Sequence, residues 1–325
     1  MPGRTLPPLR RTLPVLLLGG CLTAPVQADP YHYRDMLLGE RAIGMAGAYT
    51  AVADDPSGLY YNPAGVVYRR QTNLSASVNA FQQTRTTYED ALGGTDWERR
   101  SSSLLPNFFG VVQPLGGGVV GFSLAVPDSV HEDQDQTFND LPGTRTDKFV
   151  INFNHQLQVY KIGPSFALPV GEELAVGGTL YLHYRTEEII SNQWVRKDSG
   201  DFEWLNQYYE TEEIGVEPVL GVMWSPWSRL SLGLSLRRTF ITSASTDRQV
   251  NCSTDIPDNP NAVCLSDGSV APADPPGPFT ASSNVKRELP WELGAGVAYF
   301  ASPRLLISAD AYYYTGPDDD FQERE

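Results

Sequence analysis

The sequence predicts an all-β protein, an antiparallel outer-membrane β-barrel with a small helical plug at its N-terminus. Apolar and polar side chains alternate over stretches of about ten residues, most plainly in 230–236, where every second residue is a leucine. Short turns and long polar connections alternate between these stretches, and aromatic residues gather near their ends. Because successive side chains of a strand point to opposite faces, each strand has one apolar and one polar face. This pattern is typical of strands that face lipid on one side and a polar interior on the other.

The N-terminal region 1–28 predicts a secretory signal peptide. Three arginines precede the apolar run 13–18, and a small-residue cleavage site ends at Ala28. The alternative is a lipoprotein signal, in which Cys21 becomes the first residue of the mature chain. Beyond this segment, no uninterrupted apolar run reaches the roughly 18 residues that a membrane-spanning helix requires. A chain of this kind would therefore cross a bilayer with strands.

Residues 29–67 predict the plug. They are rich in glycine and alanine and do not alternate. We expect a short helix over 40–53, a turn at 54–58 and a second short helical turn over 59–65. Small side chains let backbone segments approach closely, which suits a segment confined inside a barrel.

Residues 68–325 predict the barrel itself. Each of the expected strands is long enough to cross the hydrocarbon layer when tilted. Single-chain bacterial barrels have even strand numbers, whereas the visible strands number nine, so we expect a barrel that is incomplete at the C-terminus or strands that the pattern does not reveal. The expected strand centres are 74–81, 107–112, 119–126, 157–168, 174–184, 214–224, 230–240, 288–300 and 305–314.

The connections between these strands fall into two kinds. Short turns on one side of a barrel and long loops on the other are how outer-membrane barrels are built. We expect short turns at 114–118, 170–173, 225–229 and 301–303, and long polar loops over 86–103, 128–148, 191–212 and 243–286.

The alternation also assigns side chains to the interior. The expected inward-facing set is polar and mixed in charge, and includes Ser75, Ser77, Thr179, Tyr181, His183, Arg185, Ser231, Ser235, Arg237, Asp310 and Tyr312. Two residues interrupt the strand pattern: Gly121 in the third strand and Pro218 in the sixth. Glycine weakens a strand and proline removes a hydrogen-bond donor from the ladder, so each position predicts a bulge or kink. For Gly121, room for a neighbouring ring is an equally good explanation.

The sequence carries no enzyme motif, so we expect a protein that is not an enzyme and that needs no cofactor. The histidines show no zinc-protease spacing, and neither a nucleophile elbow nor a phosphate-binding loop is present. A barrel lipid hydrolase built around His183 is a distant alternative. The acidic clusters lack the fixed spacing of a calcium loop, so no metal site is predicted, and solvated outer loops that meet cations at the lipopolysaccharide surface are favoured.

Cys252 and Cys264 lie in one long polar segment. In an oxidising compartment they predict a loop disulfide. A metal site formed by the pair is the weaker interpretation, because no histidine lies nearby to complete it. The net charge of −15 makes nucleic acid an unfavourable partner.

Residues 39–48 and 51–65 resemble the N-terminal plug of FadL-like outer-membrane transporters of long-chain fatty acids and aromatic hydrocarbons. The segment 289–294 is similar to the opening of a late strand in that family. The resemblance implies a fourteen-stranded barrel with a hatch inside it. In that family an Asn-Pro-Ala element of the hatch lies close to an inward kink of the third strand, which opens the wall sideways.

Carried onto this chain, the resemblance makes Asn62, Pro63 and Ala64 the hatch element and Gly121 the candidate kink. It implies passive transport of hydrophobic molecules, first of all long-chain fatty acids, across the bacterial outer membrane, with lateral exit gated by the plug. The same opening pattern also occurs in barrels that act as carriers in protein export to the cell surface. That carrier function is the alternative.

Overall fold

The computed structural model describes residues 36–68, 72–90, 96–141, 143–254 and 279–315. The predicted signal peptide and Cys264 lie outside these ranges. The described elements are the helices α1 (Glu40–Gly44) and α2 (Gly58–Tyr61), the 3-10 helix η1 (Pro63–Tyr68), and the strands β1 (Asn73–Tyr88), β2 (Trp97–Leu115), β3 (Gly118–Asn139), β4 (Thr146–Val170), β5 (Leu174–Lys197), β6 (Phe202–Trp227), β7 (Leu230–Arg237), β8 (Phe240–Thr254), β9 (Phe279–Ser283), β10 (Glu292–Ser302) and β11 (Leu305–Tyr314).

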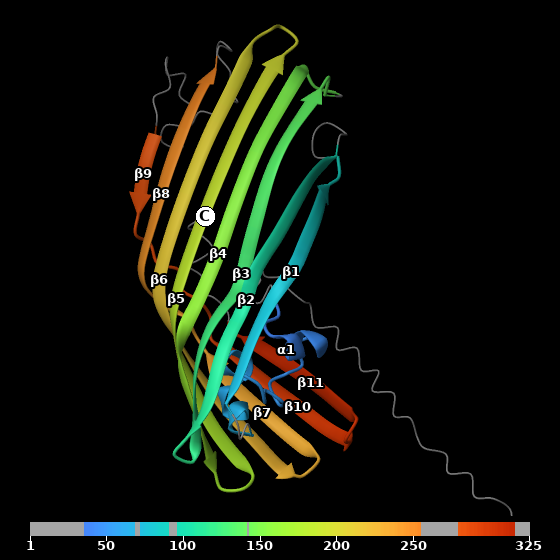
Figure 1. Ribbon diagram of the computed structural model, residues 1–325. Helices are drawn as coiled ribbons and strands as arrows, with labels where there is room; N and C mark the ends of the chain where they lie inside the picture. Colours follow the sequence, from blue (N-terminus) through green and yellow to red (C-terminus); the bar gives the residue numbers. More distant parts are fainter. Residues whose placement is uncertain (1–35, 69–71, 91–95, 142, 255–278, 316–325) are drawn as a thin grey trace, which may run out of the picture. The chain divides into compact units, whose positions relative to one another are not determined.

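The described strands form a single antiparallel sheet (Figure 1). Its order is β1-β2-β3-β4-β5-β6-β7-β10-β11, while β8 pairs with β6 and with β9. Each of the nine expected strands is found in this sheet, and β9 is an addition that the pattern did not reveal. The all-β prediction is confirmed, because every pairing between described strands is antiparallel, and β1 to β6 each pair with the next strand in the chain.

The strand expected at 230–240 is divided into two. β7 ends at Arg237, which pairs with Val219, and β8 resumes at Phe240, which pairs with Val216. The gap therefore faces Pro218. Proline lacks a backbone N–H, so the ladder loses a donor at this point, and the interruption that Pro218 predicted is found on the neighbouring strand.

The two faces of the sheet differ as the alternation predicted. On β5, Leu180 and Leu182 are 54% and 50% exposed, while Tyr181 and His183 between and beside them are 0% and 3% exposed. The exposed side chains form an apolar band on the outer face of the sheet. Its members include Phe122, Ile162, Phe166, Leu168, Leu180, Leu182, Val216, Leu220, Val222, Leu234, Val297 and Ile307.

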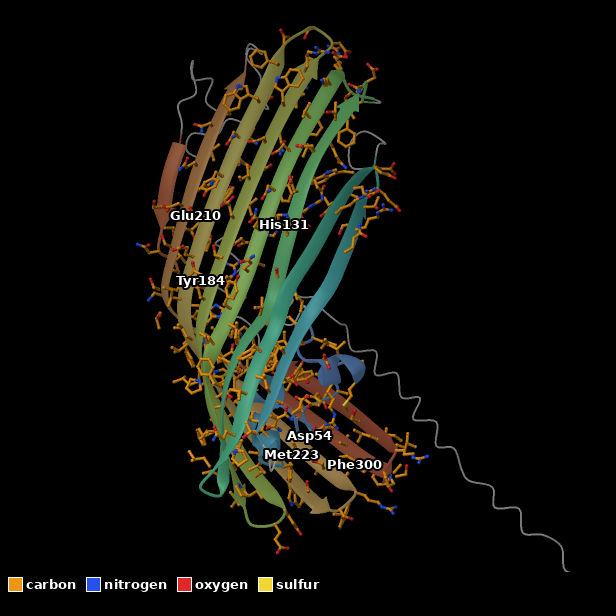
Figure 2. All side chains as sticks on the ribbon, viewed as in Figure 1. Asp54, His131, Tyr184, Glu210, Met223 and Phe300 are labelled. Carbon is orange, nitrogen blue, oxygen red and sulfur yellow. The ribbon has the colours of Figure 1, made fainter. Side chains whose placement is uncertain are left out.

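Aromatic side chains mark both borders of this apolar band. Trp224 and Trp227 lie near the short-turn end of β6, and the rings of Tyr160 and Tyr184 stack at 6.5 Å at the other border. From Leu174 to Tyr184, β5 supplies about the ten residues that a tilted strand needs to cross a hydrocarbon layer. Beyond Tyr184 the outer face becomes polar, as at Glu210 on the neighbouring strand (Figure 2).

The long polar connections are largely strand, which corrects the expectation of long loops. β3 to β6 extend well beyond the apolar band, and β6 alone has 26 residues. Polar side chains on the outer face removed the alternation from these segments, although aromatic residues that favour strands lie within them, such as Trp194, Trp204 and Tyr208. Cross-strand pairs such as Trp194 with Trp204 continue the ladder of β5 and β6 to their far end.

Among the described residues, no helix has the length and the apolar composition to cross a membrane. The helix expected over 40–53 is limited to α1. Ala46 and Gly47 end it, because both adopt positive φ angles, 51° and 82°.

The apolar band makes a direct prediction. Replacing Leu180 with arginine should destabilise the folded protein in lipid vesicles by about 2–4 kcal/mol, because the charge would face hydrocarbon. The same change at Gln156, which lies on the outer face beyond the Tyr160–Tyr184 border, should cost far less. Denaturant titration of the vesicle-inserted protein measures both. Equal costs at the two positions would show that the band does not contact lipid.

Candidate functional site

The inner face of the sheet, near its short turns, holds the N-terminal segment 36–68. Leu38, Tyr49, Ala53 and Leu59 are buried completely, as is Asn62. Together with inward side chains of the strands, this segment forms the largest apolar cluster of the described chain, to which Tyr181 and Met223 contribute. Figure 2 labels Met223 of β6 and Asp54 of the segment in this part of the sheet. The segment thus packs against the inner face of the sheet near its short turns.

Asn62 fastens this segment to β6. Its Nδ2 donates to the carbonyl of Thr50, at 2.8 Å, and to the carbonyl of Val222, at 3.0 Å. Its Oδ1 accepts a hydrogen bond of 3.2 Å from the backbone N–H of Ala64. The side chain is buried, so every one of these groups would be costly to leave unpaired. One amide thus joins the turn at Thr50, the start of η1 and the barrel wall.

Glycines in the wall make this close approach possible. Gly177 of β5 and Gly221 of β6 are direct cross-strand partners. A Cβ on Gly177 would lie 2.6 Å from the backbone N of Ala64, and one on Gly221 would lie 2.9 Å from Cδ of Pro63. Real Cβ contacts are not that short, so the Asn-Pro-Ala element fits only against a wall without side chains at these positions.

A second pair of glycines receives the preceding turn. Gly233 of β7 and Gly296 of β10 are also direct partners. A Cβ on Gly296 would lie 2.9 Å from the backbone N of Ala51, and one on Gly233 would lie 2.6 Å from the carbonyl carbon of Thr50. We call Gly177, Gly221, Gly233 and Gly296 the glycine seat of the N-terminal segment.

β11 binds the same turn through a carboxylate. Asp310 Oδ2 accepts hydrogen bonds from the backbone N–H of Tyr49, at 2.9 Å, and of Thr50, at 2.7 Å. The hydroxyl of Tyr312 lies 3.0 Å from that of Thr50. Asp310 and Tyr312 were expected to face inward, and the structure shows what they hold.

The other end of the segment is held by β1 and β2. Asn107 Nδ2 donates to the carbonyl of Leu37, at 3.0 Å, and the N–H of Gly39 donates to Ser77 Oγ, at 3.2 Å. Ser77 Oγ in turn donates to Asn107 Oδ1, at 2.7 Å. The β1–β2 register shifts directly after Ser77, which turns the buried side chain of Asn107 toward the segment.

The wall is interrupted beside Asn107. The pairs between β2 and β3 run from Leu115–Gly118 to Phe108–Ala125 and resume only at Ser101–Glu132. On its other side, β3 shifts register against β4 between Ala125 and Asp128. Strands β2 and β3 thus lose their ladder over residues 102–107 and 126–131, immediately next to the contact with Leu37.

Gly121 does not coincide with this irregularity. It pairs in regular register with Val112 and Ser165. A Cβ on Gly121 would lie 2.8 Å from Cδ1 of Leu59, so the missing side chain makes room for the N-terminal segment. The register shift of β3 lies further along, beside Pro127, which cannot donate to a ladder. The role of a kink at Gly121 stays a prediction, and the described irregularity is at 126–127.

A charged belt crosses the inner face next to Tyr60. It consists of Lys161, Arg185, Glu187, Glu213, Glu217, Arg237, Arg287 and Glu292, which come from β4, β5, β6, β7, β10 and the residues before β10. Glu217 is paired with Lys161, and its second oxygen lies 3.7 Å from Arg237. Arg287 binds Glu213 with two hydrogen bonds, of 2.5 and 2.6 Å.

The belt also contacts the N-terminal segment. Arg237 donates to the carbonyl of Tyr60 and places its guanidinium 4.4 Å from the centre of that ring. Lys161 Nζ lies 5.9 Å from the same ring. Cations over an aromatic face are stabilised by its quadrupole. Tyr60 therefore binds the belt through the hydrogen bond to its carbonyl and through the two cations near its ring.

Beyond the belt, the inner face becomes apolar again. Leu141, Phe149 and Ile151 form a buried cluster, against which Trp97 and Phe153 pack. This patch lies on the extended parts of β2 to β5, past the border of the outer apolar band. The extended strands thus carry an apolar cluster of their own on the inner face.

Within the N-terminal segment, Arg41 pairs with Asp54. Burial, together with the neighbouring Asp55 and Asp54, raises the pKa of Tyr49 far above its usual value. Tyr49 therefore stays protonated. Among the described residues, no three of the metal-binding types His, Cys, Asp and Glu are arranged to hold an ion. Cys252 is a buried residue of β8, but its expected disulfide partner lies outside the described ranges.

Comparison with known proteins identifies the fold. No protein family and no curated relative matches the sequence. Similar solved structures include the toluene transporter TodX of Pseudomonas putida, with a TM-score of 0.58 and 13% identity over 83% of this chain and 68% of that one. A FadL homologue of Pseudomonas aeruginosa has a TM-score of 0.58 and 14% identity over 87% of this chain and 70% of that one. These similarities confirm the predicted antiparallel outer-membrane barrel fold and the resemblance to FadL-like transporters.

The glycine seat can be tested with single substitutions. Gly221→Val should displace Asn62 and release the N-terminal segment, because the new side chain would occupy the position of its amide. Gly44→Val is the matched control, since a Cβ at Gly44 meets nothing within 4 Å. Limited proteolysis of the folded protein should cut within 36–68 in the Gly221 variant and not in the control. If both variants were equally protected from the protease, docking of the N-terminal segment would not depend on the glycine seat.

Asn62 can be tested by its stability contribution. Asn62→Ala should lower the free energy of unfolding by about 1–3 kcal/mol, because buried carbonyl groups lose their donor. Asn62→Asp should cost at least as much, since a carboxylate supplies no donor to either carbonyl. Thermal unfolding of the purified protein gives both values. If Asn62→Ala left the free energy of unfolding unchanged, the Asn62 amide would not hold the N-terminal segment in place.

Proposed function

We propose that this protein is a passive transporter of hydrophobic molecules across the bacterial outer membrane, with an N-terminal plug that gates lateral exit through the barrel wall. The observation that carries the proposal is the interrupted β2–β3 ladder beside Asn107. At that place Asn107 of β2 binds the N-terminal segment through the carbonyl of Leu37. A movement of the segment would therefore displace β2 where it is not paired with β3. The outer-membrane location follows from the fold and accords with the apolar outer band.

The arrangement of surfaces supports a route along the inner face. Hydrophobic molecules would first contact the apolar patch around Phe149 and Phe153, then pass the charged belt, and finally reach the N-terminal segment. An apolar chain loses about 0.8 kcal/mol for each methylene that it exposes to water. Leaving sideways into the bilayer therefore avoids a long polar passage. Movement down a gradient needs no energy source.

The cargo is a small hydrophobic molecule. The first similar structure is named as a toluene transporter, and the sequence resemblance adds long-chain fatty acids. We propose these two classes as candidates, with long-chain fatty acids as the prediction from sequence. Acidic side chains on the polar outer face, such as Asp133 and Asp135, support contact with cation-bridged lipopolysaccharide.

The alternative functions make different predictions. A carrier in surface-protein export should leave surface proteins in the periplasm when the gene is deleted. A lipid hydrolase should lose activity on replacement of His183, but that ring is 3% exposed and lies among the charges of the belt. The similar structures are transporters, and we propose that this chain is likewise not an enzyme.

Uptake by whole cells tests the proposed transport. Deleting the gene should slow uptake of oleate, of toluene or of both, and expression of the intact chain should restore it. Uptake that is unchanged for both compounds, measured with radiolabelled substrates, would contradict transport.

The gating step needs its own experiment. Asp310→Ala should loosen the turn at Tyr49 and Thr50, since two backbone N–H groups lose their acceptor, and ion conductance across a planar bilayer should rise. Asp310→Asn is the matched control, because the amide oxygen can still accept both hydrogen bonds. If the two variants conduct equally, Asp310 does not hold the plug.

A further inference from the structure

Glu217 places a carboxylate between two cations of the charged belt. Its side chain is 2% exposed and lies between Lys161 of β4 and Arg237 of β7. Thr239 donates a further hydrogen bond to the same carboxylate. The two cations are also the ones that flank the Tyr60 ring. An anionic head group arriving at Tyr60 would therefore meet cations that Glu217 already neutralises.

The rest of the described belt is balanced in the same way. Arg237 also pairs with Glu292, at 3.3 Å. Glu213 binds Arg287 and lies 3.6 Å from Arg185, whose other partner is Glu187. In this set of named residues, each cation has a carboxylate and the two kinds are equal in number. No surplus positive charge of the belt is left for an incoming anion.

Adding an anion to such a set is unfavourable. Its carboxylate would give up its hydration and would stand near the existing carboxylates without a cation of its own. An uncharged molecule has neither this cost of dehydration nor the repulsion from the carboxylates. His183, which faces the same interior from β5, strengthens the contrast: among the described residues, neither of its ring nitrogens has a hydrogen-bond partner, so a polar atom of a neutral ligand could bind there.

We propose that Glu217 is a specificity-determining residue that acts as a built-in carboxylate, excludes anionic ligands from the interior next to Tyr60, and selects uncharged hydrophobic molecules. This inference rests on the proposed transport function and narrows its cargo from two candidate classes to one. Hydrocarbons, long-chain alcohols and esters fit the belt. Fatty acids in their ionised form do not.

A matched pair of ligands tests the proposal. Oleate and oleyl alcohol share one chain and differ in head-group charge when oleate is ionised. The intact protein should take up or bind the alcohol at least about tenfold better than oleate, as expected for a close, unneutralised charge contact. Equal handling of the two ligands by the intact protein would overturn the proposal.

Removing the internal carboxylate should abolish this preference. Glu217→Gln keeps the size of the side chain and leaves Lys161 and Arg237 with surplus positive charge. The ratio of oleate to oleyl alcohol should rise by about tenfold. The double variant Lys161→Gln with Glu217→Gln restores the balance and should return the ratio toward that of the intact protein. A ratio that does not change in Glu217→Gln would overturn the proposal.

Two controls keep the result interpretable. Glu188→Gln removes a charge from the outer face of β5 and should leave the ratio within about twofold of the starting value, because surface charges contribute little. Glu292→Gln also leaves surplus charge at Arg237, so it tests the same idea if Glu217→Gln fails to fold. Folding is checked by the mobility shift on heating in detergent gels.

The readout separates this proposal from the transport proposal. Uptake by cells measures transport, whereas binding of the two ligands to protein in lipid nanodiscs measures specificity alone. Absence of uptake for both ligands would contradict transport, and the nanodisc ratio would still decide the role of Glu217. A tenfold ratio in nanodiscs that Glu217→Gln abolishes is the supporting result.

Discussion

The arrangement depends on the close approach of one polar turn to the backbone of a β-sheet. Asn62 reaches the carbonyl of Val222 in β6 because Gly221, its neighbour in that strand, has no side chain. A buried amide that satisfies three backbone groups is strongly favoured over any arrangement that leaves them unpaired. Asn62 can bind the wall only where the glycine seat leaves space for it. Glycines weaken their strands, and the docked segment restores the packing that their missing side chains would have supplied.

The N-terminal segment is held at several places of different character. Its turn at Tyr49 and Thr50 binds Asp310, its helical end binds the wall through Asn62, and its first residues bind Asn107. The last contact lies beside the unpaired part of β2 and β3. Loss of a few hydrogen bonds at one place could thus change the wall there while the others keep the segment inside the sheet.

The charged belt adds a second constraint. Buried ions are tolerable only when each has a partner, and the ion pairs around Glu213 and Glu217 meet that condition. In the proposed selection of uncharged molecules, the same ion pairs that stabilise the belt leave none of its described cations free for an anionic ligand. Tyr60 joins the two features, because it belongs to the docked segment and carries Arg237 on its ring.

The sequence by itself determined the strands, their two faces and the chemistry of the N-terminal segment. Period-two alternation is a local property, so the inward positions of Tyr181, His183 and Asp310 could be read from it, and the Asn-Pro-Ala element was recognisable from its own residues. The tertiary structure decided which residues meet. Gly177 and Gly221 are distant in the chain, and only the register of β5 and β6 makes them one seat. The pairing of β2 with β3 is interrupted at 102–107 of β2 and 126–131 of β3, and not at Gly121. Register also brought Glu217 close to Lys161 of β4 and Arg237 of β7. Contacts between strands depend on which residues the ladder sets opposite each other, and alternation along one strand carries no information about that.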